Sequence, residues 1–564
     1  MCRTLSFIVI ILLLNTATGW TVPEVIRQLN RDWDRQLNVY FDCQDQELSF
    51  DQSVSVLHLN TYFPMQRLMG RFSENALVIA CLSEATENRT LEGVKEFLWA
   101  SQHLPIFYIT NNNMNVDFSK ALKRGFLHVL AFDLKNGSLY TYKPYPKIKV
   151  HQVKDIKDFM LLTKLTNLHG EPVRISVETM SPRCFHYKNR HGKVVYAGYM
   201  YKLIQGFIET YNGNETYVLK DQDPIPYSVG FQILQNGDVD IVPRILFNFN
   251  WNYFYRSYVL YNVNSYFIVP WAEPLPKSLY FIRTFKCNVW IAFILSIIYA
   301  SIAIWWIKFR KQSAESNSLA STFLDVLQLM VQLPNPIQWH FNLGFHHLIS
   351  LLVLLPVGFV LTNMYTAQLS SSLTTGLYKQ QIDSFDDMVD GKFKLLLESL
   401  DKEVLQNMSK RNYIQPGLQN IILETSLKEV LYFRKNLNTS YLYLAFGDRI
   451  EFELSQQKYL RVPLFKILPE IFVQSLFFIP LRHGLPYVEL FNNYLQRIWE
   501  SGIYEKLRLN AYFEGIASGE ITFRKSTTWE TQVFNMEFYY FAYILLAVGW
   551  FLGGVIFLVE KWRG

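Results

Sequence analysis

The sequence predicts a membrane protein of mixed α/β class, in which membrane-length helices interrupt soluble regions with alternating strand and helix patterns. Three observations support this: an apolar leader, three long segments without charged residues, and flanks of mixed periodicity. With 564 residues, of which 50% are hydrophobic, the chain is too long for one ordinary domain and too apolar for a purely soluble protein. The net charge of +6 is small for this length, and no basic patch alternates with aromatic residues, so we expect no nucleic-acid partner.

The amino terminus has the order of a secretory signal peptide. Arg3 precedes an apolar run at residues 5–14, and the small residues Ala17, Thr18 and Gly19 follow it. We therefore expect residues 1–19 to be a signal peptide and the mature chain to begin outside the cell. A retained anchor is the less favoured alternative, because the apolar run is too short to span a bilayer.

Three later segments are long enough to cross a membrane, which takes about 20 apolar residues. They cover residues 287–307, 347–369 and 538–559, and none contains Asp, Glu, Lys or Arg. Basic residues follow the first segment at Lys308 and the third at Lys561, so the positive-inside rule places both these ends in the cytoplasm. We expect a multi-pass plasma-membrane protein with an extracellular amino terminus and a cytoplasmic tail at residues 560–564.

Glycosylation sequons agree with this topology, because acceptor sites are used only outside the cytoplasm. All five fall in the stretches predicted to be extracellular: Asn88, Asn136, Asn214, Asn407 and Asn438. None falls in the loop that follows the first crossing.

The segment at residues 308–346 contains a short apolar run, residues 321–336, that cannot span a bilayer as a helix. Non-helical backbone at membrane depth is tolerated only where protein or water satisfies its polar groups, as in a re-entrant pore loop. The alternative is an amphipathic helix that lies on the inner membrane surface. The order of crossing, short hairpin and crossing favours the pore loop.

The carboxyl end of the second crossing fills with polar residues instead of ending in charge. Its residues Tyr365, Thr366, Ala367, Gln368 and Leu369, followed by Leu373 and Thr374, resemble the gate-helix signature of ionotropic glutamate receptors. Gln368 stands where that family usually has Asn. The resemblance implies a subunit of a ligand-gated cation channel, with these five residues as the gate and with Gln332, Leu333, Pro334 and Asn335 in the narrow part of the pore.

The same resemblance implies a two-lobed, periplasmic-binding-protein-like ligand domain that is split by the membrane segment. Its lobes would be residues 171–286 and 370–537, preceded by a reduced amino-terminal α/β domain at residues 20–170. A predicted strand at residues 173–177 and a predicted helix at 199–208 fit the first lobe, and a helical stretch at 487–508 fits the second. The resemblance covers residues 170–564.

The residues that should recognise an amino acid are absent. Receptors of this family hold the ligand's carboxylate with an Arg, and Asn252 stands at that place, with Arg244 and Arg256 nearby but out of register. The acid that takes the ligand's amine would fall at Phe446, beside Asp448. Two further ligand-binding candidates are Tyr199 and Glu398. The chain therefore resembles the divergent chemosensory ionotropic receptors of arthropods, and the implied ligand is a small chemical cue other than glutamate.

One subunit has too few helices to enclose a pore, so the resemblance implies a tetramer mixed with co-receptor subunits, in sensory-neuron dendrites. A non-conducting auxiliary subunit is the alternative. A membrane enzyme is disfavoured, because no nucleophile with a base, paired carboxylates or metal-ligand spacing is found; Asp238 and Asp240 are read as strand-end residues. We expect no catalytic residues, no cofactor and no metal.

Cysteines are few. After loss of the leader, Cys43, Cys81, Cys184 and Cys287 remain, and an oxidising compartment permits a bridge. Cys43 and Cys81 are the preferred pair, although spacing does not establish connectivity.

Overall fold

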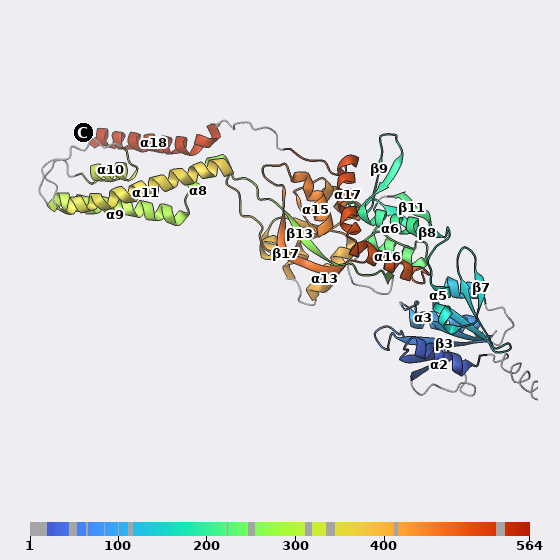
Figure 1. The fold of residues 1–564 in the computed structure, drawn as a ribbon. Coiled ribbons are helices and arrows are strands. Elements are labelled where there is room, and N and C mark those ends of the chain that lie inside the picture. The colour runs from blue at the N-terminus through green and yellow to red at the C-terminus, as the bar shows by residue number, and fades with distance from the viewer. Residues whose placement is uncertain are drawn as a thin grey trace, which may run out of the picture. The chain divides into compact units, whose positions relative to one another are not determined.

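We describe the protein from a computed structural model. It covers residues 20–43, 54–63, 66–83, 85–99, 101–110, 117–222, 224–245, 254–310, 318–333, 345–410, 416–525 and 536–563. The predicted signal peptide lies outside these described residues. The chain divides into two compact units: unit 1 is Met1–Pro270 with Ser384–Lys525, and unit 2 is Trp271–Asp383 with Ser526–Gly564. Unit 1 is mixed α/β and unit 2 is helical (Figure 1).

The amino-terminal part of unit 1 is a seven-stranded sheet in the order β2-β1-β3-β4-β5-β6-β7. The strands β2, β1, β3, β4 and β5 pair in parallel, and β6 and β7 are antiparallel. The elements are β1 (Leu37–Phe41), β2 (Ser55–Leu59), β3 (Ala76–Leu82), β4 (Ile106–Thr110), β5 (Val129–Asp133), β6 (Ser138–Lys143), β7 (Lys149–Val153), α2 (Val22–Asp32), α3 (Glu87–Leu98), α4 (Phe118–Lys123) and α5 (Ile156–Thr163).

Both faces of this sheet are covered. Every residue of β1, β4 and β5 is buried, which is the pattern of parallel strands packed on two sides. Within β3, Leu77 and Ile79 enter one hydrophobic core, and Val78 enters the other. The alternation of side chains along each strand therefore builds two cores from a single apolar run.

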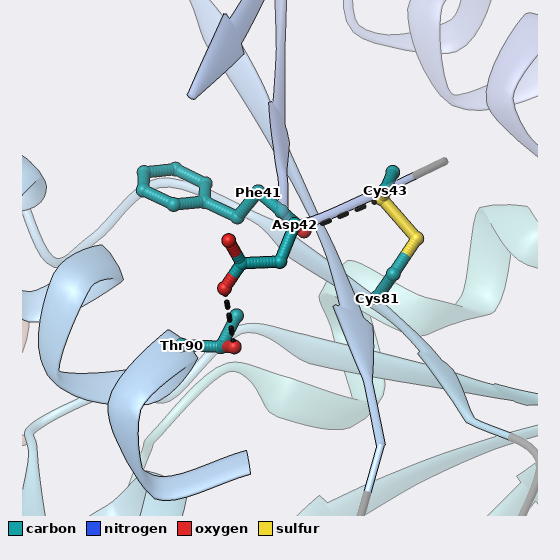
Figure 2. The surroundings of a disulfide bond; sticks show 5 residues. All are labelled: Phe41, Asp42, Cys43, Cys81 and Thr90. Carbon is teal, nitrogen blue, oxygen red and sulfur yellow. Dashed lines mark hydrogen bonds between the residues drawn. A yellow bond between two sulfur atoms is a disulfide. The ribbon is translucent and has the colours of Figure 1, made fainter. Parts of the chain in front are cut away.

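A disulfide joins the carboxyl ends of β1 and β3. Parallel pairing places Phe41 opposite Ala80, so Cys43, two residues after β1, lies beside Cys81 of β3, with Cα atoms 5.1 Å apart and sulfur atoms bonded (Figure 2). This is the pair preferred from the sequence. Beside it, the Asp42 carboxylate accepts hydrogen bonds from the Thr61 amide at 3.0 Å and the Thr90 hydroxyl at 2.7 Å. Burial raises the pKa of Asp42, but these donors outweigh it and hold the pKa below its usual value.

The rest of unit 1 forms two further α/β layers, which we call lobe A and lobe B. Lobe A contains β8 (Pro172–Glu178), β9 (Phe185–Lys188), β10 (Val194–Ala197), α6 (Tyr199–Thr210), β11 (Asn214–Gln222), α7 (Tyr227–Asn236), β12 (Tyr255–Arg256), β18 (Pro480–Leu481), α16 (Val488–Glu500) and α17 (Ile503–Ser518). Its core packs Ile175 and Phe207 against Phe477 and Phe491. The strand expected around Asp240 is reduced to bridges that Ile241 makes with Ile175 and Leu481.

Lobe B is a five-stranded sheet in the order β15-β14-β16-β13-β17, with helices around it. Its elements are β13 (Asn262–Pro270), α12 (Phe385–Asp390), β14 (Lys394–Leu397), α13 (Ser399–Lys410), η2 (Pro416–Ile421), β15 (Ile422–Glu424), α14 (Leu427–Lys435), β16 (Tyr441–Phe446), α15 (Gly447–Leu454), η3 (Ser455–Gln457) and β17 (Phe465–Leu476). Ile268, Leu396 and Tyr443 form its core.

Both lobes take elements from both sides of the unit 2 insertion. Strand β13 precedes the insertion but pairs with β16 and β17, which follow it. Helix α16 follows the insertion but packs against α6 in the core of lobe A. The lobes therefore differ from the contiguous ranges 171–286 and 370–537 expected from the sequence. The reason is that hydrophobic faces of elements far apart in the sequence pack together.

Unit 2 contains long apolar helices. Its elements are η1 (Lys277–Leu279), α8 (Tyr280–Arg283), α9 (Cys287–Arg310), α10 (Leu319–Met330), α11 (Phe345–Thr375), η4 (Met536–Tyr539) and α18 (Tyr540–Arg563). Among the described residues, two helical stretches are long and apolar enough to cross a membrane, Cys287–Trp306 and Tyr540–Val559. The predicted second crossing lies within α11, whose 31 residues correspond to about 46 Å of helix. Within the described residues of this unit, no pore domain is evident.

The short helix α10 packs against both α9 and α11. Val326 and Met330 of α10 are buried with Ile297 of α9 and Leu354 of α11. A Cβ atom at Gly358 would lie 2.8 Å from the Met330 carbonyl oxygen, so only glycine permits this approach. Nearby, the Thr362 hydroxyl donates to that same oxygen at 3.3 Å. Helix α10 ends at Met330, and Gln332, two residues later, has a φ of 58° in the left-handed region.

Two segments of unit 2, one before α8 and one after α11, are joined by backbone hydrogen bonds. The Leu275 amide donates to the Leu377 carbonyl at 2.7 Å, and the Lys379 amide donates to the Glu273 carbonyl at 2.9 Å. The buried Tyr280 hydroxyl accepts from the Leu377 amide at 3.1 Å. The chain segments on either side of helices α9 to α11 therefore form one connected element.

Candidate functional site

A buried ion pair connects lobe A to lobe B. Arg183, in the loop after β8, donates from Nε and Nη2 to the two carboxylate oxygens of Asp448, at 2.8 and 2.9 Å. The two side chains are 0% and 3% exposed. This bidentate geometry matches the planar guanidinium to the carboxylate, so both charges are compensated away from water.

Local structure fixes both partners. Asp448 lies in the first turn of α15, where the positive end of the helix dipole stabilises a carboxylate. The Arg183 carbonyl accepts from the Met200 and Tyr201 amides at the start of α6, each at 3.1 Å. A Cβ atom at Gly198 would lie 2.5 Å from that carbonyl oxygen, and its φ is 105°, so glycine is required there.

Tyr199 and Phe446 complete the site. The Tyr199 hydroxyl donates to Asp448 Oδ2 at 2.7 Å, and the Arg183 guanidinium lies 5.1 Å from the centre of the Phe446 ring. Burial alone would raise the pKa of Asp448, but the Arg183 charge and hydrogen bonds lower it to about 2. Burial, and then the Asp448 charge, raise the pKa of Tyr199 well above its usual value. The pair is therefore ionised and the phenol neutral at physiological pH.

A cavity of about 160 Å³ lies between the lobes, and its lining includes Ser181, which precedes Arg183 in the same loop, and Phe452, which follows Asp448 on α15. Lobe A contributes Thr179, Met180, Ser181 and Pro224, and the segment after α17 contributes Glu520. Helices α14 and α15 and the start of η3 contribute Lys428, Leu431, Tyr432, Lys435, Phe452, Glu453 and Gln456. At one side the Ser181 hydroxyl donates to Glu520 at 2.9 Å, and Lys435 pairs with the other Glu520 oxygen at 2.7 Å.

The structure brings together three of the seven ligand-binding candidates, namely Tyr199, Phe446 and Asp448. Arg183 is the member that the sequence did not suggest. A buried Arg requires an acidic partner, but nothing in the sequence pairs residues that lie 265 positions apart.

The other candidates lie elsewhere. Arg244 is buried in a second ion pair with Glu178 of β8 and also donates to the Ile225 carbonyl. Arg256 packs over the Phe478 ring at 5.0 Å, and desolvation lowers its pKa to about 10. Asn252 lies outside the described residues.

Glu398 lies at the carboxyl end of β14, near the start of α13. Burial, and then the Glu398 charge, raise the pKa of the neighbouring Asp401 to about 7. The two acids therefore lie close enough for their charges to interact.

The gate candidates lie on α11. The Tyr365 hydroxyl donates to the Phe281 carbonyl at 3.2 Å, and its ring contacts Phe285 and Trp290. The side chains of Thr366, Ala367 and Gln368 are exposed, and that of Leu369 is half-buried. Of the pore candidates, Gln332 and Leu333 are exposed after the end of α10, and Pro334 and Asn335 lie outside the described residues.

The predicted glycosylation sites are accessible. Four of the Asn side chains are exposed and the fifth, Asn438, is half-buried. Within the described residues, no group of three or more His, Cys, Asp or Glu side chains could hold a metal ion.

Comparisons of the chain with protein-family models and with curated proteins find no match.

Proposed function

We propose that the chain is a chemosensory subunit of a ligand-gated cation channel, of the ionotropic-receptor type that its gate segment resembles. The observation that carries this proposal is the division of unit 1 by unit 2. The chain leaves lobe B after β13, passes through α8 to α11, and returns to lobe B at α12. A periplasmic-binding-protein-like domain built in this way is attached to the membrane segment at both ends of the insertion.

This connection supplies a mechanism. A ligand acts only if it favours one arrangement of the lobes over another. The hydrogen-bonded segments at residues 272–275 and 377–381 then transmit lobe B movement to α8 and α11 as one element. Movement of α11 displaces Thr366, Ala367 and Gln368, whose exposed side chains would meet the equivalent helices of partner subunits.

The proposal places the protein in the plasma membrane, with the third crossing in α18. Residues 321–336 would form the re-entrant pore loop, in a heteromeric tetramer with co-receptor subunits. Its ligand is a small chemical cue other than glutamate.

The test is to record currents from the full-length subunit co-expressed with candidate co-receptors, against a panel of odorants, tastants and cuticular compounds. We expect a current that requires this subunit, and Ala367→Trp should change its resting level. Val150→Trp, at an exposed position of β7, is the matched control and should leave the current unchanged. If the Ala367→Trp subunit reaches the cell surface in normal amount and its resting current is unchanged, the gate assignment is contradicted.

One observation favours a second candidate, a non-conducting auxiliary subunit. The buried Arg183–Asp448 pair joins the lobes through the chain's own side chains, as expected for a subunit that assembles but does not respond. The two functions differ at the pore loop. Gln332→Arg should change ion permeation of a conducting subunit and leave permeation through an auxiliary complex unchanged.

A further inference from the structure

The interlobe cavity has an apolar interior and a polar edge. Met180 and Phe452 are buried at its wall, and Leu431 is half-buried. Tyr432 and the two lysines, Lys428 and Lys435, are exposed at its edge. Small-molecule sites in proteins share this composition, with mostly apolar walls and a few polar groups that fix orientation.

The charged residues that line the cavity are already engaged within the chain. Lys435 pairs with Glu520 at 2.7 Å, and Glu453 accepts from Arg434 at 2.6 Å. Lys428 is likewise not free. On the same helix as Phe452 and Glu453, Asp448 is neutralised by Arg183. A charged ligand would lose its hydration without gaining an ion pair with an uncompensated opposite charge. Its binding would therefore cost free energy.

Hydroxyl groups and size complete the description. Thr179, Ser181 and Tyr432 place hydroxyls around the apolar wall, which suits one neutral hydrogen-bonding group. In proteins, an apolar cavity of about 150 Å³ holds one benzene ring. The interlobe cavity is of this size.

We propose that the interlobe cavity binds small uncharged organic molecules, of about the size of one aromatic ring with one polar substituent. This inference rests on the proposed function in one respect, namely that the cavity is the ligand site of the receptor. What it adds is that the ligand carries no net charge.

The test uses three probes that share one ring and differ in charge: benzyl alcohol, benzoate and benzylamine. Each is added at millimolar concentration to the purified full-length protein in detergent, and the melting temperature is measured. Benzyl alcohol should raise it by a few degrees, because a ligand that binds only the folded state stabilises that state. Benzoate and benzylamine should not.

Cavity-filling variants separate binding at this site from effects on the micelle. Leu431→Trp and Met180→Trp should each remove the benzyl alcohol shift. Ile467→Trp, on an exposed position of β17, should retain it. The compared quantity is the difference in shift between the unmodified protein and Leu431→Trp, since partition into detergent affects both equally. Using Leu431, which is only half-buried, keeps the test valid if Met180→Trp fails to fold.

A larger cavity-dependent shift with benzoate or benzylamine would overturn the inference, as would no cavity-dependent shift with any of the three. The two proposals fail separately. A cavity-dependent benzyl alcohol shift, with no current in any subunit combination, would contradict the channel and leave the ligand class standing. A current evoked by a charged ligand that binds in this cavity would contradict the ligand class and leave the channel proposal standing.

Discussion

Arg183 and Asp448 form a bidentate ion pair across the two lobes, at 2.8 and 2.9 Å, although 265 positions separate them in the sequence. The pair holds lobe A to lobe B through side chains that are almost completely buried. Since each charge depends on the other for compensation, this pair is one of the interactions that set the relative position of the lobes.

Loss of one partner should destabilise unit 1 strongly. Asp448→Ala leaves the Arg183 charge buried without compensation, and we expect a loss of about 3–5 kcal/mol in the free energy of unfolding. The double variant Arg183→Met, Asp448→Leu should lose less than either single change, because apolar side chains need no counter-charge. Urea unfolding measures both. Glu451→Ala, which removes an exposed partner of Arg508, should cost less than about 1 kcal/mol. Equal costs for the double and single variants would contradict this account.

The same carboxylate predicts a dependence on pH. The pKa of Asp448 is lowered to about 2 in the folded protein, against about 3.9 for an unfolded Asp. A lowered pKa contributes stability that is fully present above pH ~4 and is lost as the pH falls towards ~2. We expect the free energy of unfolding of the unmodified protein to fall by roughly 2 kcal/mol more than that of Asp448→Asn between pH ~4 and pH ~2. Urea unfolding curves of the two proteins at each pH measure this difference. Parallel curves would show that Asp448 does not titrate in this way.

Removal of the disulfide should destabilise the amino-terminal domain. The bond closes a loop of 38 residues, for which loss of chain entropy in the unfolded state gives about 4 kcal/mol. The double variant Cys43→Ala, Cys81→Ala should therefore unfold at a lower urea concentration. Limited proteolysis at each urea concentration measures this, through the release of fragments that contain β1 and β3. Cys287→Ser removes an exposed free thiol and is the control. An unchanged midpoint in the double variant would mean that the bond does not constrain this domain.

Gly125 should be needed where the amino-terminal domain contacts lobe A. A Cβ atom there would lie 2.6 Å from the backbone of Gly484, and its φ is 84°. Gly125→Ala should therefore force the two backbones apart and increase amide hydrogen exchange at residues 482–489. Gly70 has a similar φ of 77° but open space around it, so Gly70→Ala adds the same conformational strain without the clash. Equal exchange in the two variants would rule out the close approach as the cause.

Gly358 should be needed for the packing of α10 against α11. Gly358→Leu places side-chain atoms where the Met330 carbonyl lies, so we expect α10 to detach. The readout is the reactivity of a cysteine introduced at the buried position Val326, in a Cys287→Ser background, which should rise several-fold. The matched change Gly549→Leu on α18 meets no neighbouring atom within 4 Å and should not raise it. If the introduced cysteine stays protected in Gly358→Leu, the packing does not depend on this glycine.

Much of the architecture followed from local pattern. The strand β8 and the helices α6 and α16 lie where the residue pattern predicted them, since burial imposes such a pattern. The strand expected around Asp240, at residues 236–243, is not formed. Only Ile241 pairs there, in isolated bridges with Ile175 and Leu481. For the cysteines, the residue spacing left only a preference, and the parallel pairing of β1 with β3 decided the bond.

The sequence by itself determined the membrane-length helices and the mixed α/β class. Both depend on hydrophobic length and period, which are properties of consecutive residues. Only the tertiary structure decided which elements make up each lobe, that Arg183 compensates Asp448, and that a cavity remains between Met180 and Phe452. These features depend on which distant surfaces meet, and a buried charge or an apolar wall acquires its partner only when the chain has folded.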